Sequence, residues 1–214
     1  MTEHDRAGGA LELLRAATAR YPRITFATGF GVEGCVVIDL IGRHSLPIDV
    51  FTLDTGVMFP ETLELWQRLE ARYRLTIRAV RSLTRVEDGL WTRNPDECCH
   101  RRKVEPLRRE LRQFDAWVTA IRSEQTPERA AAQPIEDDPK FGLVKVNPLL
   151  TWTHKDVWRQ VHAFDIPYNP LHDRGYPSIG CWPCTTPVGI GENPRAGRWR
   201  GLAKTECGLH TKES

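Results

Sequence analysis

The chain has 214 residues, of which 40% are hydrophobic and 27% are charged, and this composition excludes disorder throughout. Thirty basic and 28 acidic residues leave a formal net charge of +2, so no bulk positive charge argues for a nucleic-acid partner. The longest stretch without a charged residue, 175–191, is interrupted by glycines and prolines and therefore predicts a loop and no membrane span.

Residues 1–5 lack the basic start and apolar centre of a secretory signal, so we expect a cytoplasmic protein. Six cysteines are present. In a reducing compartment they are expected to be thiols that bind a metal or react.

Hydrophobic periodicity predicts alternating strands and helices. The predicted strands are 24–28, 48–53, 76–80 and 116–121. The predicted helices are 11–19, 32–41, 60–73, 104–111 and 153–161. Residues 126–140 are rich in Pro, Ala and acidic side chains and predict a mobile loop, and the prolines after Phe164 predict irregular structure.

This alternation predicts an α/β fold, with a twisted, mostly parallel sheet and helices on its faces. We expect one domain over residues 1–199 and a flexible tail over 200–214. Ligands of such sheets bind beyond the carboxyl ends of the strands. Gly29, residues 54–56 and Arg122 each follow a predicted strand and are therefore expected to face one crevice.

Four cysteines form two pairs, the adjacent Cys98 and Cys99 and the spaced Cys181 and Cys184. Thiolates from distant segments can hold an iron–sulfur cluster or a structural zinc ion. Neighbouring side chains on a helix diverge, which suits separate corners of a cubane better than one small ion. The spacing favours a cluster, and zinc or unligated thiols are the alternatives.

Cationic and glycine-rich segments predict an anion site. Lys103 lies one helical turn after Cys99 and is expected on the same face. Arg195 and Arg198 are three residues apart, and two guanidinium groups suit a dianion. The turn at 28–34 joins a strand to a helix, where backbone N–H groups attract anions. Solvated surface charges and an ordinary glycine turn are the alternative interpretations.

Cys207 lies seven residues before the chain end. A cysteine on a flexible segment can move in and out of a site, so it is a candidate nucleophile. Lys204 and His210 are close in sequence and would favour its thiolate. An incidental surface cysteine is the alternative. Cys35, among apolar residues of a predicted helix, is expected to be a buried hydrophobe.

Taken together, these motifs resemble those of the assimilatory, thioredoxin-dependent adenylyl-sulfate reductases, a branch of the phosphoadenylyl-sulfate reductase family. The resemblance covers about residues 24–210. It rests on Leu53-Asp-Thr-Gly56, Cys98-Cys99 with Arg102-Lys103, Tyr168-Asn-Pro-Leu-His172, Gly175-Tyr-Pro-Ser-Ile-Gly-Cys181, Cys184, Gly197-Arg-Trp199 and Glu206-Cys-Gly-Leu-His210.

The resemblance implies an adenine-nucleotide α-hydrolase-like sheet of the PP-loop type. It implies a [4Fe–4S] cluster that is held by Cys98, Cys99, Cys181 and Cys184. It also implies that Cys207 attacks the sulfur of adenosine 5′-phosphosulfate and expels AMP. Thioredoxin, or a glutaredoxin-like reductant, then releases sulfite from the S-sulfocysteine.

The same resemblance assigns substrate-binding residues. Lys103, Arg195 and Arg198 would surround the sulfate, and Leu53 and Thr55 would lie near the adenosine. Thr28, Gly29, Phe30 and Gly31 would form the loop against the phosphosulfate, although many relatives have Ser-Phe-Ser-Gly there. Arg122 is a weaker candidate, because many relatives have two arginines where this chain has Arg122 and Ser123.

Two alternatives stay open at this point. One is a reductase that prefers the 3′-phosphorylated nucleotide. The other is a metal-bearing regulatory or RNA-modifying protein with the same fold, which the nearly balanced charge disfavours. We expect no nucleic-acid or membrane partner, and the sequence leaves open whether the chain forms a homo-oligomer.

Overall fold

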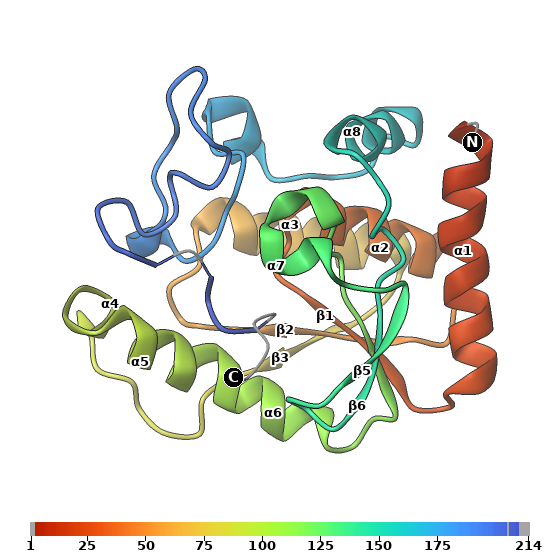
Figure 1. Cartoon of the computed structure of the whole chain (residues 1–214), viewed down its shortest axis with the longest axis horizontal. Coiled ribbons are helices and arrows are strands. Elements are labelled where there is room, and N and C mark those ends of the chain that lie inside the picture. The colour runs from red at the N-terminus through yellow and green to blue at the C-terminus, as the bar shows by residue number, and fades with distance from the viewer. Residues whose placement is uncertain (1–2, 205, 210–214) are drawn as a thin grey trace.

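The computed structural model describes residues 3–204 and 206–209 of the chain, and a six-stranded sheet forms its centre (Figure 1). The strand order is β3-β2-β1-β4-β6-β5. Every pairing is parallel except that of β5 with β6 at the edge. The strands are β1 (Ile24–Thr28), β2 (Asp49–Leu53), β3 (Ile77–Val80), β4 (Ala116–Val118), β5 (Ile135–Asp138) and β6 (Leu143–Val146). The predicted α/β class with a mostly parallel sheet is confirmed.

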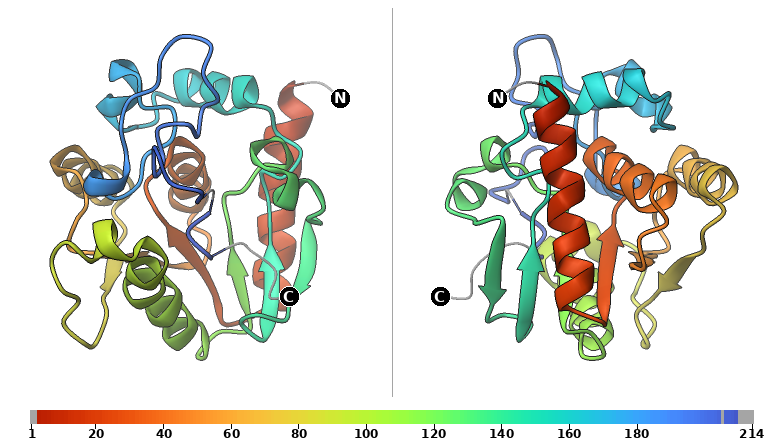
Figure 2. Two further views of the ribbon diagram at one scale, coloured as in Figure 1. Left: turned by 60° about the vertical axis from the view of Figure 1, so that its left-hand side comes forward. Right: turned by 90° about the vertical axis from the view of Figure 1, so that its right-hand side faces the viewer.

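Helices cover both faces of this sheet, as the two side views show (Figure 2). One layer contains α1 (Glu3–Arg20), α2 (Val32–Arg43), α3 (Pro60–Tyr73) and α8 (His154–Ala163). The other contains α4 (Leu90–Arg93), α5 (Pro95–Cys99), a π-helical segment (His100–Val104) and α6 (Glu105–Leu111). No helix within the described residues is long and apolar enough to cross a membrane.

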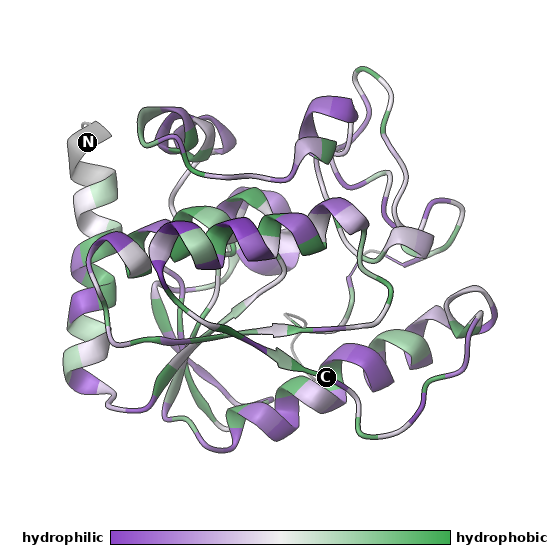
Figure 3. Cartoon of the chain, turned by 180° about the vertical axis from the view of Figure 1, so that it is seen from behind, coloured by the Kyte–Doolittle hydropathy of each residue, from purple (hydrophilic) through white to green (hydrophobic). Residues whose placement is uncertain are grey.

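Alternate strand residues supply two apolar cores, one on each face of the sheet. Val50 packs toward α1, α2 and α3, whereas Phe51 packs toward α6. Burying a side chain of this size stabilises the fold by about 1.5–3 kcal/mol. The smaller core, here named the α6 cluster, contains Phe51, Leu53, Val80, Leu107, Leu111 and Trp117. From behind, the strands show hydrophobic colour between helices of mixed colour (Figure 3).

Local departures from the predicted elements occur around β4 and β5. The segment 126–140 was expected to be a loop, but it contains α7 (Pro127–Ala130) and β5. Trp117 Nε1 donates to Asp138 Oδ2 at 3.1 Å, which ties β5 to the α6 cluster although its sequence is acidic. The strand β6 had no prediction. The strand β4 ends at Val118, so residues 119–121 are free to line a cavity.

Beyond α8 the chain is mainly irregular, as predicted, with two short 3-10 turns at Pro170–Arg174 and Trp182–Cys184. This region, drawn in blue, runs past the carboxyl ends of the parallel strands (Figure 1). A single bridge pairs Thr185 with Arg198. The C-terminal region therefore covers the edge of the sheet at which ligands of α/β folds bind.

Candidate active site

A cavity of about 550 Å³ lies at the carboxyl ends of β1, β2 and β4. The strand order changes direction at β1, which pairs with β2 on one side and with β4 on the other. Such a switch point is the usual ligand crevice of an open α/β sheet. The sequence-predicted residues that line the cavity are Thr28, Gly29, Gly31, Leu53, Thr55, Lys103, Arg122, Cys181, Arg195, Arg198 and Cys207.

The loop after β1 brings backbone N–H groups to one wall of this cavity. Thr28 Oγ1 accepts a hydrogen bond from Phe30 N at 3.1 Å. Gly31 is the N-cap of α2 and supplies no side-chain acceptor, so the first N–H groups of the helix remain suited to an anion. A Cβ on Gly34 would lie 3.0 Å from Thr28 Oγ1, which explains that glycine.

Phe30 differs from its neighbours in this loop. Its backbone has a φ of 58°, and its ring stacks on Trp66 with centroids 5.6 Å apart. The side chain is buried in the core and is not among the residues that line the cavity. The Phe30 side chain thus anchors the loop to the hydrophobic core and does not face the cavity.

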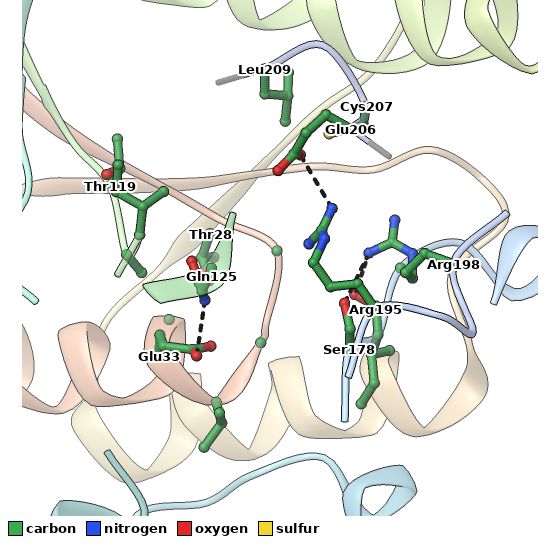
Figure 4. Close-up of a pocket in the computed structure, with 18 of the residues that line it drawn as sticks. Thr28, Glu33, Thr119, Gln125, Ser178, Arg195, Arg198, Glu206, Cys207 and Leu209 are labelled. Atoms are coloured by element: carbon green, nitrogen blue, oxygen red, sulfur yellow. Dashed lines mark hydrogen bonds and ion pairs between the residues drawn. The ribbon is translucent and has the colours of Figure 1, made fainter. Parts of the chain in front are cut away.

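Arg122 lines the cavity, but two carboxylates hold its guanidinium. Its Nε donates to Glu33 Oε1 at 2.9 Å, and its Nη1 donates to Glu124. Gln125 Nε2 also donates to Glu33 Oε1, at 3.0 Å (Figure 4). This geometry makes Arg122 an organiser of the loop wall, and its contact with a substrate stays a prediction.

Lys103 occupies the boundary between the large cavity and a second, smaller one. It lies in the π-helical segment that follows Cys99, so the regular helical turn expected there is widened. Burial alone would lower the pKa of Lys103, but the neighbouring Cys181, Cys207 and Cys99 together raise it. Lys103 is therefore a half-buried cation whose charged form is favoured by three nearby cysteines.

All four paired cysteines line the smaller cavity. Burial raises the pKa of the Cys98 and Cys184 thiols, and raises that of Cys99 to about 11. Burial opposes ionisation of Cys181 as well, but Lys103, a hydrogen bond with Thr55 and Arg198 together lower its pKa. Cys181 Sγ and Thr55 Oγ1 are hydrogen-bonded at 3.4 Å. Cys181 also lines the large cavity.

These four thiols fit a soft metal centre by their chemistry and by their common cavity. Among the described residues, no three His, Cys, Asp or Glu side chains are already arranged as a set of metal ligands. The cluster expected at Cys98, Cys99, Cys181 and Cys184 therefore stays a proposal.

Further cationic side chains gather opposite the loop. Arg198 is half-buried, and the desolvation of its guanidinium lowers its pKa. Its Nη1 lies 3.5 Å from Ser178 Oγ (Figure 4). Arg195 Nη2 lies 3.2 Å from Glu206 Oε2. Arg129, on α7, lies 2.9 Å from the other oxygen of Glu206.

No role for Arg129 or Glu206 was predicted from the sequence. Arg129 falls in the segment expected to be a loop, where one arginine among polar residues carries no signal. Glu206 is the first residue of the motif Glu206-Cys-Gly-Leu-His210. The motif singles out this residue, but its contacts cannot be deduced from the motif. Other polar residues of the cavity, for which the sequence predicted no individual role, are Glu33, Thr62, Thr119, Glu124, Gln125, His154, His172, Ser178 and Asn193.

Cys207 lies in the large cavity with Arg195, Arg198 and Glu206 around it (Figure 4). Lys140 Nζ donates to Gly208 O at 2.6 Å, and Leu209 packs against the α6 cluster. Lys204 pairs with Asp96, and His210 lies outside the described residues. Residues 206–209 therefore place the candidate nucleophile among the cations.

Comparisons with known proteins identify the family. The model of the phosphoadenosine phosphosulfate reductase domain matches residues 23–187. The chain belongs to this family. Cys98, Cys99, Lys103, Cys181 and Cys184 fall inside the matched range, whereas Arg195, Arg198 and Cys207 follow it.

Curated relatives match over most of the chain. An adenosine 5′-phosphosulfate reductase 1 of Bacillus subtilis is 46% identical over 97% of this chain and 93% of its own length. A phosphoadenosine 5′-phosphosulfate reductase of Gloeobacter violaceus is 47% identical over 88% of this chain and 82% of its own.

Solved structures agree with the fold. The phosphate complex of the phosphoadenylyl-sulfate reductase of Candida auris has a TM-score of 0.75 at 31% identity, over 83% of this chain and 90% of that one. The FMN adenylyltransferase of Candida glabrata has a TM-score of 0.66 at 16% identity, over 90% and 70%. The second likeness shows the fold alone.

Proposed function

We propose that the chain is an assimilatory adenylyl-sulfate reductase that converts adenosine 5′-phosphosulfate to sulfite and AMP. One observation carries the proposal: Cys207 shares a single cavity with the loop after β1 and with Lys103, Arg129, Arg195 and Arg198. The names of relatives that are 45–46% identical support the nucleotide.

The cavity suits displacement at sulfur. The Cys207 thiolate attacks the sulfur of the sulfate group, and the bond from that sulfur to the bridging oxygen breaks. AMP leaves with the electron pair, and Cys207 keeps the sulfonate. Because a thiolate and a sulfate repel each other, the cations lower the barrier by stabilising charge in the transition state.

A dithiol reductant completes the reaction. One thiolate of thioredoxin, or of a glutaredoxin-like protein, attacks Cys207 Sγ and expels sulfite. The second thiol resolves the mixed disulfide, so the two electrons come from the reductant and Cys207 returns to the thiol.

Cys98, Cys99, Cys181 and Cys184 would hold a [4Fe–4S] cluster, whose negative charge would tune the field of the site. Lys103 and Cys181 line both cavities. Lys103 therefore presents its positive charge to the substrate at the boundary between the substrate cavity and the cavity that the four thiols line. Zinc on the same four thiols is the alternative that metal analysis decides.

The sequence also supports proposals for the location, the domain organisation and the partners of the protein. We propose a cytoplasmic enzyme with a nucleotide-binding reductase domain over residues 1–199 and a catalytic tail over 200–214. We propose no nucleic-acid or membrane partner.

The test is an anaerobic purification with iron and sulfide quantified, followed by assay with thioredoxin. We expect sulfite release from adenosine 5′-phosphosulfate, a gain of one sulfonate on Cys207 by mass spectrometry, and loss of both in Cys207→Ser. Cys35→Ser is the matched control, because the Cys35 side chain is fully buried in α2 and does not line the cavity.

The 3′-phosphorylated nucleotide is offered in competition, and preference for it would reverse the substrate choice. Full turnover by Cys207→Ser would show that Cys207 is not the nucleophile. If fully metallated protein never acquires a sulfonate from adenosine 5′-phosphosulfate, the proposed function is wrong.

A further inference from the structure

The carboxylates of the large cavity divide into two groups. Glu33 and Glu124 hold Arg122. Glu206 instead lies between Arg129 and Arg195, at 2.9 and 3.2 Å. Its side chain is only 5% exposed, and those of the two arginines are 10% and 22% exposed. A carboxylate this deeply buried is stable only while cations compensate it.

The cations have more donor capacity than Glu206 uses. Among the described residues, neither Arg129 Nε nor Arg198 Nε has a hydrogen-bond partner, although both atoms are buried. The four cations of this wall are Lys103, Arg129, Arg195 and Arg198, and a doubly charged phosphosulfate would suit them better than one carboxylate does.

The chain places this carboxylate immediately before the nucleophile. Within the described residues 206–209, contacts of Glu206, Gly208 and Leu209 anchor the segment that contains Cys207. Glu206 binds the two arginines, Gly208 O accepts from Lys140, and Leu209 packs on the α6 cluster. Of these anchors, the first uses cations that line the cavity, Arg129 and Arg195, whereas Lys140 does not line it.

We propose that Glu206 is a positioning residue that acts as an internal stand-in for the substrate anion. In the ligand-free protein its carboxylate neutralises Arg129 and Arg195 and holds Cys207 in the cavity. The incoming phosphosulfate displaces the carboxylate, while Gly208 and Leu209 keep the tail docked. This inference rests on the proposed function for the identity of the anion.

Displacement exchanges one anion for another on the same two guanidinium groups. The ligand-free cavity thereby avoids uncompensated buried cations, and the substrate enters without adding its full charge. A ligand that must displace Glu206 binds less tightly than it would to the bare cations, because the two compete.

The test compares Glu206→Gln with the wild type, both with their metal centre intact. Inorganic sulfate and AMP are titrated by calorimetry. Because glutamine is a neutral competitor, we expect both to bind at least about fivefold more tightly, the lower end of typical coupling between sites. Iodoacetamide should also alkylate Cys207 faster in the ligand-free variant, because its first anchor is lost.

Arg129→Gln weakens the same pair from its other side and keeps the test decisive if Glu206→Gln folds poorly. Alkylation of Cys207 should again be faster, but sulfate should now bind more weakly, because a cation is gone. Glu206→Asp keeps the competing charge and should restore the wild-type sulfate affinity. A merely structural role would not give opposite signs in the two variants.

The matched control is Glu192→Gln. Glu192 pairs with Arg200 near the surface and lies outside the cavity, so sulfate affinity and alkylation should stay at wild-type values. Unchanged or weaker sulfate binding by Glu206→Gln would overturn the inference. Failure of the proposed function would instead appear as wild-type Cys207 that is never sulfonated, and the sulfate titrations would still report on Glu206.

Discussion

Two glycines near Arg198 show how single residues set the cationic wall. A Cβ on Gly180 would lie 2.3 Å from Arg198 Nη2 and 2.5 Å from its Cζ. A Cβ on Gly197 would lie 2.0 Å from the backbone oxygen of Thr186. The first clash is with the end of a flexible side chain, whereas the second is with backbone. The same substitution should therefore have different consequences at the two sites.

We expect Gly180→Ala to fold normally and to push the Arg198 guanidinium aside. If Arg198 binds the phosphosulfate, the KM for the nucleotide should rise roughly tenfold, as for loss of one charged hydrogen bond. Gly197→Ala should instead lower the free energy of unfolding by about 1–3 kcal/mol, the usual cost of overpacking. Steady-state kinetics and urea unfolding separate the two. Iron content is measured in both, because Gly180 precedes Cys181.

An unchanged KM for the nucleotide in Gly180→Ala would show that Arg198 does not bind the nucleotide. Gly189→Ala serves as the control, because the nearest atoms to its added Cβ belong to the flexible Glu192 side chain, at 3.5 Å or more.

At the residue scale, the sequence predicted which cysteines and cations belong to the site better than it predicted which residues pair with each other. Paired cysteines, a lysine one turn away and a cysteine near the end carry recognisable chemistry at fixed spacing, and the structure brings them to adjoining cavities. Arg129 and Glu206 meet across 77 residues. Nothing local in either segment encodes that pairing, so only the folded chain reveals it.

At the scale of elements, the approach of α2 to α3 depends on Gly42. A Cβ at that position would lie 2.5 Å from Tyr73 Cβ, an atom that cannot move unless the helices separate. Tyr73 also donates its hydroxyl to the buried Asp39, at 2.9 Å. We expect Gly42→Ala to cost about 1–3 kcal/mol of unfolding free energy, measured by urea titration.

Gly9→Ala provides the comparison within a helix. No atom lies within 4 Å of the added Cβ, and Gly9 is exposed in α1. Alanine should therefore stabilise the protein by about 0.5–1 kcal/mol through its higher helix propensity. Equal stability of Gly42→Ala and the wild type would contradict the close packing described for α2 and α3.

Elements with strong apolar periodicity were predictable, and those that tertiary contacts determine were not. The strands β1, β2 and β3 and the helices α2 and α3 follow the pattern of the sequence. The strand β5 is acidic, and its pairing with β6 and the hydrogen bond from Trp117 hold it in place. The widened turn at His100–Val104 was also not predicted, because π-helical turns are rare and occur mostly as single turns inside α-helices.

At the scale of the molecule, the two apolar cores stop short of the C-terminal region. Among the described residues after Tyr168, only Leu209 packs against either core. The stretch 175–199 is held instead by contacts such as Trp182 N to Val57 O, at 3.0 Å. If Cys98 and Cys99 share a cluster with Cys181 and Cys184, the cluster is a cross-link between this stretch and α5.

Removal of the metal should therefore loosen one region and leave the sheet intact. We expect hydrogen exchange in residues 175–199 to accelerate at least about tenfold, which corresponds to about 1.4 kcal/mol of opening free energy. Exchange in α2 should be unchanged, because its buried residues belong to the larger core. The measurement compares metal-loaded protein with protein that has been oxidised and treated with a chelator, by mass spectrometry of peptides.

Cys184→Ser should lose iron and show the same local loosening without treatment. Cys35→Ala should keep its iron and its slow exchange, because Cys35 is fully buried in α2 and burial raises the pKa of its thiol. If metal removal accelerated exchange equally in α2 and in residues 175–199, the centre would support the whole fold. The C-terminal region would then be no separate, metal-held layer over the carboxyl ends of the strands.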